Sequence, residues 1–245
     1  MSKGPVLILG ARSDIGLAVA KNFASLGHPI QLAAREAQKL APDRDDISTR
    51  YNVEVTLHEF DALHPDRFAG FLDSLPELPE VAACAIGYMG EQEDSESNLT
   101  AASLVMRSNY EGPVGILSEL ANRFEDRGSG VIIGISSVAG QRGRATNYFY
   151  GSAKAGFTAF LSGLRNRLAK KGVHVITVLP GFVATRMTEN LDLPKKLTAQ
   201  PAEVAEKIAL AVKKSRNVIY VRSIWFLIMT IICNIPESIF KKMKL

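Results

Sequence analysis

The stretch that decides the fold runs from Val6 to Gly16 and reads VLILGARSDIG. Its four apolar residues, 6–9, predict a buried strand, and apolar residues then recur every four positions from Ile15 to Phe23, as on one face of a helix. Gly10 permits a tight turn between them, and Gly16 permits close packing of the helix on the strand. The unit therefore predicts a phosphate site at the helix N-terminus, formed by Gly10, Arg12, Ser13, Asp14, Ile15 and Gly16.

Asp14 stands where many sequences of this pattern have a glycine. As an acid at the start of a helix, it is suited to cap the helix. Its carboxylate must point away from any bound phosphate, because the two charges repel.

Short apolar runs alternate with helical patterns along the remaining chain, which indicates a parallel sheet covered by helices on both faces. The predicted strands are residues 6–9, 29–34, 53–60, 81–86, 130–136, 173–179 and 218–221. The predicted helices that follow the first are residues 98–124, 148–171 and 201–214, and the second of these is expected to bury Ala153, Phe157, Phe160, Leu164 and Leu168. The fold class is thus α/β, with a doubly wound seven-stranded sheet in a single domain.

Length and composition agree with one folded domain, since 47% of the 245 residues are hydrophobic and 22% are charged. We expect residues 1–222 to form this domain and residues 223–245 to form an apolar and then basic tail. The net charge of +4 is spread along the chain, so no nucleic-acid partner is expected. Cys84 and Cys233 lie far apart, which excludes a disulfide framework or metal cluster and, with the absence of a signal peptide, favours the cytoplasm.

The end of the second predicted strand bears on cofactor choice. Folds that bind NAD usually place an acid there for the ribose 2′-hydroxyl, but this chain has Ala34 followed by Arg35. A guanidinium pairs with a phosphate through two hydrogen bonds, and Arg12 lies in the neighbouring turn, so NADP(H) is favoured. The alternative is that Arg35 is a solvated charge and that NAD(H) binds. Asp61, with Ala62 beside it, is placed to accept from an adenine amino group.

Three residues form a candidate catalytic set. Tyr150 and Lys154 lie four residues apart on one helix face, and Ser137 lies at a strand end. An ammonium and a nicotinium ring beside the phenol are expected to lower its pKa toward the working range. Ser137 is expected to orient the substrate oxygen, and Asn109 to hold a water that passes the proton to Lys154.

In order and spacing, these residues resemble the short-chain dehydrogenase/reductases over essentially the whole chain. The resemblance implies a Rossmann fold, hydride transfer between a nicotinamide and a carbonyl or alcohol, and a homodimer or homotetramer. It implies Asn109, Ser137, Tyr150 and Lys154 as the catalytic residues. It also implies further cofactor contacts from Gly87, Pro180, Gly181, Val183 and Thr185. The chain departs from the family pattern after the fourth strand, where Cys84-Ala85-Ile86-Gly87 replaces Asn-Asn-Ala-Gly.

Within the family, the chain resembles the keto-reducing subunits of decaprenylphosphoryl-ribose 2′-epimerases. Three segments carry this resemblance: residues 85–90, residues 141–150 with the sequence QRGRATNYFY, and residues 235–242. It implies a 2-keto sugar on a polyprenyl phosphate as the substrate. The usual cofactor of that subgroup, NADH, disagrees with the preference inferred from Arg35.

The apolar tail allows three interpretations. Residues 223–235 carry no charge and are too short for a spanning helix, which needs about 20 residues. The tail could pack over the substrate pocket or a subunit interface. It could lie peripherally on the inner face of a membrane, with Trp225 at headgroup depth and the lysines on anionic lipid. It could be a true anchor.

The residues therefore predict an NAD(P)(H)-dependent oxidoreductase that interconverts a carbonyl and a secondary alcohol on a small or lipid-linked molecule. An alternative in the same class is a ketoreductase of an acyl or steroid-like substrate. An alternative of another class is a catalytically silent regulatory protein that binds the cofactor. Residues 187–200 are expected to cover the pocket.

Overall fold

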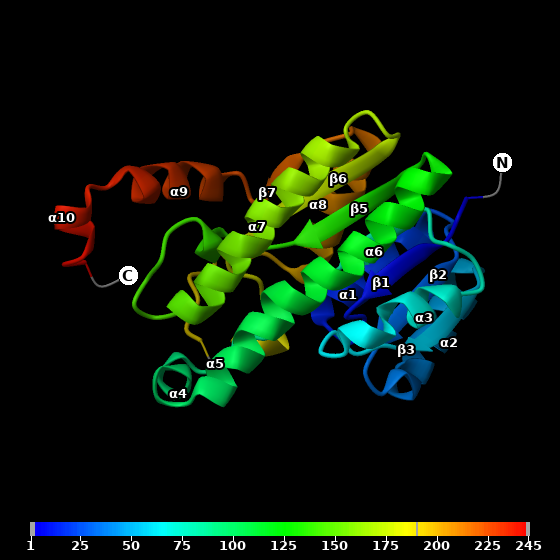
Figure 1. The fold of residues 1–245 in the computed structure, drawn as a ribbon, viewed down its shortest axis with the longest axis horizontal. Helices are drawn as coiled ribbons and strands as arrows, with labels where there is room; N and C mark the ends of the chain where they lie inside the picture. Colours follow the sequence, from blue (N-terminus) through cyan, green and yellow to red (C-terminus); the bar gives the residue numbers. More distant parts are fainter. Residues whose placement is uncertain (1–2, 190, 244–245) are drawn as a thin grey trace.

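The computed structural model describes residues 3–189 and 191–243 of the chain. Within these residues, seven parallel strands form one sheet in the order β3-β2-β1-β4-β5-β6-β7 (Figure 1). The strands are β1 (Val6–Leu9), β2 (Ile30–Ala34), β3 (Val55–Glu59), β4 (Val81–Cys84), β5 (Gly130–Ile135), β6 (Val173–Pro180) and β7 (Val218–Val221). The predicted doubly wound sheet is confirmed, and its strand order reverses between β1 and β4.

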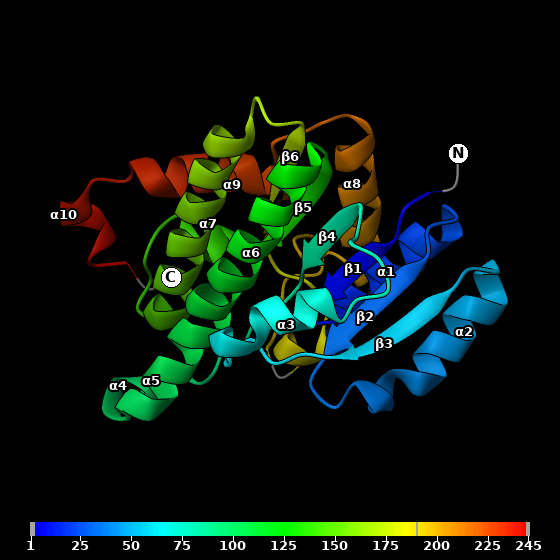
Figure 2. The ribbon, with the colours of Figure 1, turned by 45° about the vertical axis from the view of Figure 1, so that its right-hand side comes forward.

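Helices cover both faces of this sheet. They are α1 (Asp14–Ser25), α2 (Ala41–Tyr51), α3 (Phe68–Asp73), α4 (Gln92–Ser97), α5 (Leu99–Met106), α6 (Gly112–Arg127), α7 (Tyr148–Leu168), α8 (Pro201–Lys213), α9 (Ile224–Asn234) and α10 (Glu237–Phe240). Helices α1, α2 and α8 pack on one face, and α3, α6 and α7 pack on the other (Figure 2).

Strand β1 shows how the sequence divides the core. Val6 and Ile8 pack with the helices of the first face, and Leu7 and Leu9 pack with those of the second. All four side chains are fully buried. Because successive strand residues point to opposite faces, a short strand that is apolar throughout must lie between two helical layers.

The helices differ from the prediction in several places, and α2, α3, α4, α9 and α10 were not among the predicted helices. Residues 98–124 were expected as one helix, but α5 and α6 are joined by a π-helical turn, Arg107–Glu111. Helix α2 was not predicted, because its sequence APDRDDISTRY is largely polar and buries only Ile47. On α7 the expected burial holds for Ala153, Phe157, Leu164 and Leu168, whereas Phe160 is only partly buried.

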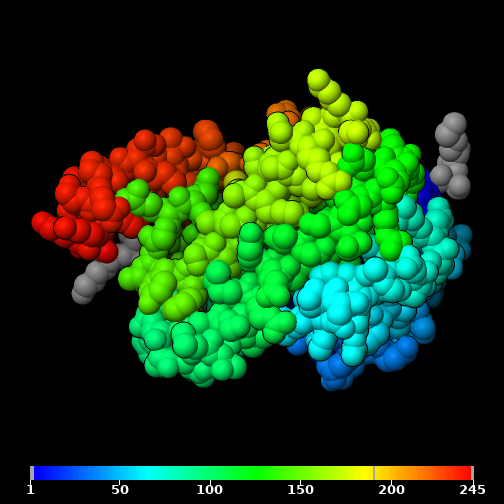
Figure 3. Space-filling model, in the orientation of Figure 1, coloured from blue at the N-terminus to red at the C-terminus, as the bar shows by residue number. Residues whose placement is uncertain are grey.

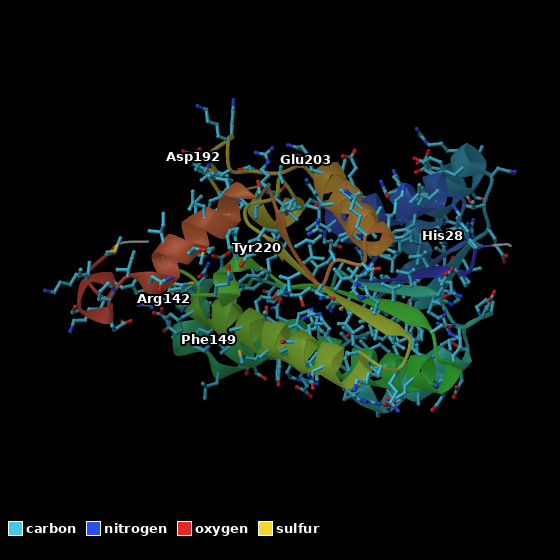
Figure 4. The ribbon with its side chains drawn as sticks, turned by 90° about the horizontal axis from the view of Figure 1, so that it is seen from above. His28, Arg142, Phe149, Asp192, Glu203 and Tyr220 are labelled. Carbon is cyan, nitrogen blue, oxygen red and sulfur yellow. The ribbon has the colours of Figure 1, made fainter. Side chains whose placement is uncertain are left out.

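The C-terminal helix α9 packs against the fold through one face. Trp225 and Met229 are buried in a cluster with Val138 and Leu179. Figure 4 shows Tyr220 and Arg142 close to this helix, and Figure 3 shows the C-terminal segment as a projection at one end of the molecule. Because Trp225 is buried in the protein, its predicted place at lipid headgroup depth is wrong. Lys244, part of the predicted basic tail, lies outside the described residues.

The other face of α9 is apolar and open. Phe226 and Ile231 are each 59% exposed, and Leu227 is 55% exposed. No helix among the described residues combines the length and the hydropathy that crossing a membrane requires. Cys84 and Cys233 are both free, as expected.

Candidate active site

A cavity of about 560 Å³ lies at the carboxyl ends of the strands, beside the point where strand order reverses. Sixteen of the predicted site residues line it: Gly10, Arg12, Ser13, Asp14, Ile15, Arg35, Asp61, Ala62, Gly87, Ser137, Tyr150, Lys154, Pro180, Gly181, Val183 and Thr185. The other two, Gly16 and Asn109, pack behind the cavity wall. The fold thus brings together residues that lie far apart in the sequence.

The two glycines at the turn after β1 have no room for a side chain. Gly10 has φ of +83°, and a Cβ atom there would lie 2.9 Å from the backbone of Ala85. A Cβ atom on Gly16 would lie 2.7 Å from the carbonyl oxygen of Gly10. Ser13 caps α1 by accepting a hydrogen bond from the Gly16 N–H at 3.0 Å. The predicted capping by Asp14 is therefore wrong, because Ser13 occupies the cap position and Asp14 is the first helical residue.

Asp14 instead ties α1 to the loop after β6. Its Oδ2 accepts from the backbone N–H of Arg186 at 2.8 Å, and its Oδ1 accepts from the Arg186 Nε at 3.0 Å. Arg186 also donates to the carbonyl of Arg12. The Asp14 charge is thus neutralised by Arg186, which removes much of its expected repulsion toward a phosphate in the adjoining turn.

The two arginines predicted near the adenosine end differ in their surroundings. Arg12 Nη1 donates to Glu36 Oε2 at 2.6 Å, and Lys39 pairs with the same carboxylate. Both cations lower the pKa of Glu36. Arg35 is exposed and, among the described residues, has no hydrogen bond or ion pair from its side chain. Arg35 is therefore the cation at this end that a ligand could pair with, whereas Arg12 is already occupied.

Asp61 and Ala62 follow β3 at the same end of the cavity. One oxygen of Asp61 accepts from the Leu63 N–H at 3.0 Å, which fixes the side chain. Ala62 packs against Gly112, where an added Cβ would lie 2.8 Å from the Ala62 methyl. The geometry keeps Asp61 at the cavity wall.

At the other end, Tyr150 and Ser137 are joined by a hydrogen bond. Ser137 is nearly buried, and its Oγ also accepts from the Ala139 N–H at 3.1 Å. Burial raises the pKa of Tyr150 to about 12, and the hydrogen bond from Ser137 offsets only part of this rise. The expected lowering of the tyrosine pKa by Lys154 is therefore wrong for the protein alone, since desolvation of the phenolate dominates.

Lys154 is 2% exposed and makes its hydrogen bonds to backbone carbonyls. Its Nζ donates to Ile135 O at 3.2 Å and to Ile86 O at 3.4 Å. The same Nζ lies 5.7 Å from the centre of the Tyr150 ring. No carboxylate of residues 3–189 or 191–243 pairs with it, and burial lowers the pKa of Lys154 to about 8. This amine thus titrates within the physiological range.

Asn109 lies on the π-helical turn and is fully buried. Its Nδ2 donates to the carbonyls of Val105 and Tyr88, and its Oδ1 accepts from the Tyr88 N–H at 3.3 Å. A Cβ on Gly87 would lie 3.2 Å from Asn109 Oδ1 and 3.6 Å from Lys154 Nζ. Asn109 thus braces the loop after β4, and Gly87 leaves open the space between Asn109 and Lys154.

The segment after β6 closes the cavity. Val183 forms an isolated parallel bridge with Ala199, and Thr188 Oγ1 donates to Val183 O at 2.6 Å. Gly181 lies directly under Trp225, which occupies the space where a Cβ would stand. From the predicted covering segment, residues 187–200, Met187, Thr188 and Leu191 line the cavity. Asn190 lies outside the described residues.

Several residues of the cavity wall were not assigned a site role from the sequence. They include Arg144, Asn147, Phe182, Arg186 and Trp225. Arg144 and Asn147 precede α7 in the segment 141–150, whose charged and amide residues were the signal available. Trp225 belongs to the tail, for which pocket coverage was one of the interpretations.

The comparisons with known proteins agree with this geometry. The family model described as short chain dehydrogenase matches residues 5–196. An uncharacterized oxidoreductase of Mycobacterium tuberculosis is 35% identical over 221 residues, which cover 89% of this chain and 88% of that protein. An uncharacterized oxidoreductase of Streptomyces coelicolor is 32% identical over 241 residues, which cover 97% and 95%.

Among solved structures, a short-chain dehydrogenase from Sphingobium yanoikuyae in complex with NADPH has a TM-score of 0.81 at 21% identity. The match covers 96% of this chain and 97% of that one, so the two share their fold. Together, the matched family model, the relatives and the parallel sheet show that the chain belongs to the short-chain dehydrogenase/reductase family of oxidoreductases.

Proposed function

We propose that the chain is an NADP(H)-dependent reductase that interconverts a carbonyl and a secondary alcohol through Tyr150. The main support for this proposal is that a single cavity contains both the predicted cofactor turn and the predicted catalytic side chains. The glycine turn and helix N-terminus lie at one end, and the hydrogen-bonded Ser137 and Tyr150, with the Lys154 amine nearby, lie at the other.

The side chains at the catalytic end divide the work. Tyr150 donates its proton to the carbonyl oxygen, and its raised pKa keeps it protonated throughout the working range. Ser137, already bonded to Tyr150, orients the same oxygen. Lys154 supplies positive charge that stabilises the phenolate left behind, and Asn109 holds a water beside Gly87 that returns a proton through Lys154. The bound nicotinamide supplies or accepts the hydride.

The cofactor set comprises the predicted site residues that line the cavity, with the exception of Ser137, together with Gly16 behind them. The turn at Gly10 fits a pyrophosphate, since it lines the cavity directly before the N-terminus of α1, whose backbone N–H groups favour an anion. Arg35, free of other partners, fits a 2′-phosphate, and this supports NADP(H) over NAD(H). Val183 and Thr185 face the cavity at the end where the carboxamide is expected.

For the substrate we favour a keto-sugar on a lipid carrier. Two observations support it: residues 141–150 form part of the cavity wall through Arg144, Asn147 and Tyr150, and the apolar α9 adjoins the cavity through Trp225. A ketoreductase of an acyl or steroid-like substrate uses the same apolar wall, but it requires no polar group at Arg144.

The open face of α9 supports peripheral contact with the inner face of a membrane, by an enzyme that is otherwise cytoplasmic. Phe226, Leu227 and Ile231 are exposed there, and Lys241 and Lys242 are exposed nearby on the same tail. Apolar side chains beside lysines are typical of helices that lie on anionic lipid. By resemblance to the family, we also propose that the protein forms a homodimer or a homotetramer.

The test is the substitution Tyr150→Phe, which removes one oxygen and leaves the ring in place. We expect turnover of keto compounds with NADPH to fall by at least about a thousandfold, because the proton donor is lost. NADPH affinity, measured by nucleotide fluorescence, should change by less than about threefold. Tyr148→Phe, two residues away on the exposed side of α7, is the matched control and should keep wild-type rates.

Turnover by Tyr150→Phe at near wild-type rates would contradict this mechanism. If the wild-type protein binds NADPH tightly and reduces no member of a broad panel of ketones, the silent regulatory protein is the better interpretation. The pH profile adds a second measurement. Because Lys154 loses its charge above a pKa of about 8, kcat/KM for reduction should fall as the pH rises beyond this value.

A further inference from the structure

Arg144 is a cation of the cavity wall whose guanidinium has no hydrogen-bond or ion-pair partner in the part of the chain that the structure describes. It lies in the loop between β5 and α7, six residues before Tyr150, and both side chains line the cavity. The Arg144 Nε is buried and has no hydrogen-bond partner. Among the described residues, no carboxylate forms an ion pair with this guanidinium.

The other cations of the cavity wall show what is unusual about Arg144. Arg12 pairs with Glu36, Arg186 pairs with Asp14, and Lys154 donates to two carbonyls. Arg35 is exposed, so water satisfies it. Arg144 is half-buried, and burial without a compensating acid lowers its pKa. A guanidinium stays protonated in proteins, so this position carries a charge that is poorly solvated and unpaired.

Arg142, two residues earlier, provides a contrast within the same loop. It donates to Glu237 Oε2 at 2.6 Å and to the carbonyls of Cys233 and Ile235 at 3.3 Å. Its guanidinium also lies 4.2 Å from the centre of the Phe240 ring. Arg142 thus fastens the C-terminal tail to the loop, whereas Arg144 contributes nothing comparable to the fold.

A second unpartnered group lies beside Arg144 on the cavity wall. The Asn147 Oδ1 is buried and has no hydrogen-bond partner, although Asn147 is the residue before α7 and could have capped it. The Arg144 carbonyl accepts from the Asn147 N–H at 3.1 Å, so a tight turn holds the two residues together. One donor and one acceptor, both desolvated and both unused, therefore lie on neighbouring residues of the cavity wall.

Apolar side chains also line this end of the cavity. Phe182 and Trp225 lie edge to face at 5.1 Å between ring centres, and Val138 completes the wall. A molecule held here must offer apolar surface to the rings and a charged group to Arg144.

We propose that Arg144 binds an anionic group, a carboxylate or a phosphate, on the carbonyl substrate, and that Asn147 accepts a hydrogen bond from a neighbouring hydroxyl. The fork of a guanidinium matches both anions through paired N–H donors. The proposal rests on the function proposed above and narrows its substrate to anionic carbonyl compounds. The reacting carbonyl is thereby held at a fixed distance from the anion and close to Tyr150.

Binding can be tested without turnover, because Trp225 is the single tryptophan of the chain and lines the cavity. Phenyl phosphate and benzoate should change its fluorescence on titration, and phenol should do so only at much higher concentration. In Arg144→Gln the affinity for both anions should fall at least about tenfold. Arg67→Gln removes the same charge from an exposed position outside the cavity and should bind like the wild type.

Turnover is tested with phenylglyoxylate and its methyl ester, which differ only in the anion. The wild type should prefer the acid in kcat/KM, and Arg144→Gln should lose this preference mainly through KM while it reduces the ester normally. Arg144→Lys should restore part of it, since a point charge replaces the fork. Inorganic phosphate should compete with the acid and not with the ester. A stronger effect of phenyl phosphate than of benzoate would identify the anion as a phosphate.

Equal affinities of the wild type and Arg144→Gln for both anions would overturn the proposal. A loss of NADPH affinity in Arg144→Gln without loss of anion binding would also overturn it, since Arg144 would then serve the cofactor. Where Arg144→Gln does not fold, the competition by phosphate in the wild type decides. If anion binding depends on Arg144 and no carbonyl is reduced, the anion site stands and the proposed reductase function fails.

Discussion

Burial acts on Tyr150 and Lys154 in opposite directions, because it disfavours the charged form of each. The pKa of the phenol rises to about 12, and that of the amine falls to about 8. In carbonyl reduction the phenol must start protonated, so its raised pKa suits the proposed donor. The anion that forms must then be stabilised, and the Lys154 charge 5.7 Å from the ring is available only below a pH of about 8.

Arg35 gives the residue-scale test of cofactor choice. We expect Arg35→Ala to weaken NADPH binding by about tenfold to a hundredfold, because a phosphate loses a charge-assisted hydrogen bond. NADH has no 2′-phosphate, so its affinity should change by less than about threefold. The dissociation constants of both nucleotides for both proteins provide the measurement.

Lys39→Ala is the matched control, since Lys39 is a neighbouring surface cation that pairs with Glu36 and does not line the cavity. It should leave the ratio of the two affinities unchanged. A wild-type protein that binds NADH more tightly than NADPH would refute the assignment of Arg35.

The candidate site was largely predictable from residue types at fixed spacings. The sequence alone identifies the glycines of the turn, Ser137, Tyr150 and Lys154, because few other residue types can meet the same backbone or chemical demand. The sequence could not predict which charged side chains form ion pairs with one another. Whether Asp14 meets Arg186, or Arg12 meets Glu36, depends on loops that the fold brings together from distant positions. The pKa of Tyr150 in the protein alone could not be predicted for a related reason, since burial is a property of the whole surroundings.

At the scale of elements, α7 is held at a short distance from β5. Ser136 Oγ donates to Lys154 O at 3.0 Å and bonds with Thr158 Oγ1 at 2.7 Å. A Cβ on Gly140 would lie 2.6 Å from Ala155 N and 2.7 Å from Lys154 C. The loop after β5 and the helix that carries Tyr150 thus touch backbone to backbone, and this contact sets the position of the proposed catalytic residues.

The substitution Gly140→Ala should therefore displace α7. We expect it to destabilise the protein by about 1–3 kcal/mol, because the added methyl meets backbone that cannot rotate away. The melting temperature should fall, and kcat should fall with it since Tyr150 and Lys154 move together. Thermal unfolding and steady-state kinetics on the purified variant measure the two effects.

Gly143→Ala is the control in the same loop, because a Cβ there would have no atom within 4 Å. Its stability should stay within about 0.5 kcal/mol of the wild type. A Gly140→Ala protein with unchanged stability and kcat would show that the loop yields, and that it does not position α7.

Strongly periodic elements were predictable and weakly periodic ones were not. All seven strands were placed within about two residues of their observed ends, because an apolar run between helices has few other solutions. Helix α2 was missed, since its polar sequence owes its place to packing of Ile47 and to Pro42 in its first turn. The π-helical turn was missed because one extra residue in a helix leaves no periodic signal.

At the scale of the molecule, the C-terminal segment joins two surfaces of opposite character. Its inner face completes the cavity: Trp225 Nε1 donates to Leu197 O at 3.1 Å, and Cys233 Sγ donates to Gln141 O. Its outer face leaves Phe226, Leu227 and Ile231 exposed. A substrate with a lipid chain would meet both surfaces, because the same short helix borders the cavity and the solvent.

The proposed membrane contact predicts that the wild-type protein floats with anionic phosphatidylglycerol vesicles and less with neutral phosphatidylcholine vesicles. The double substitution Phe226→Asp and Ile231→Asp should abolish flotation, since charge on the apolar face opposes insertion and repels the lipid. It should leave NADPH binding intact, because neither side chain lines the cavity. Leu26→Asp, at an exposed apolar position after α1, should float like the wild type. If the double variant still floats, the tail does not carry the contact. A different result is also informative. If the wild type does not float with vesicles, and the double variant has a lower mass than the wild type in sedimentation, the outer face of α9 is a subunit interface.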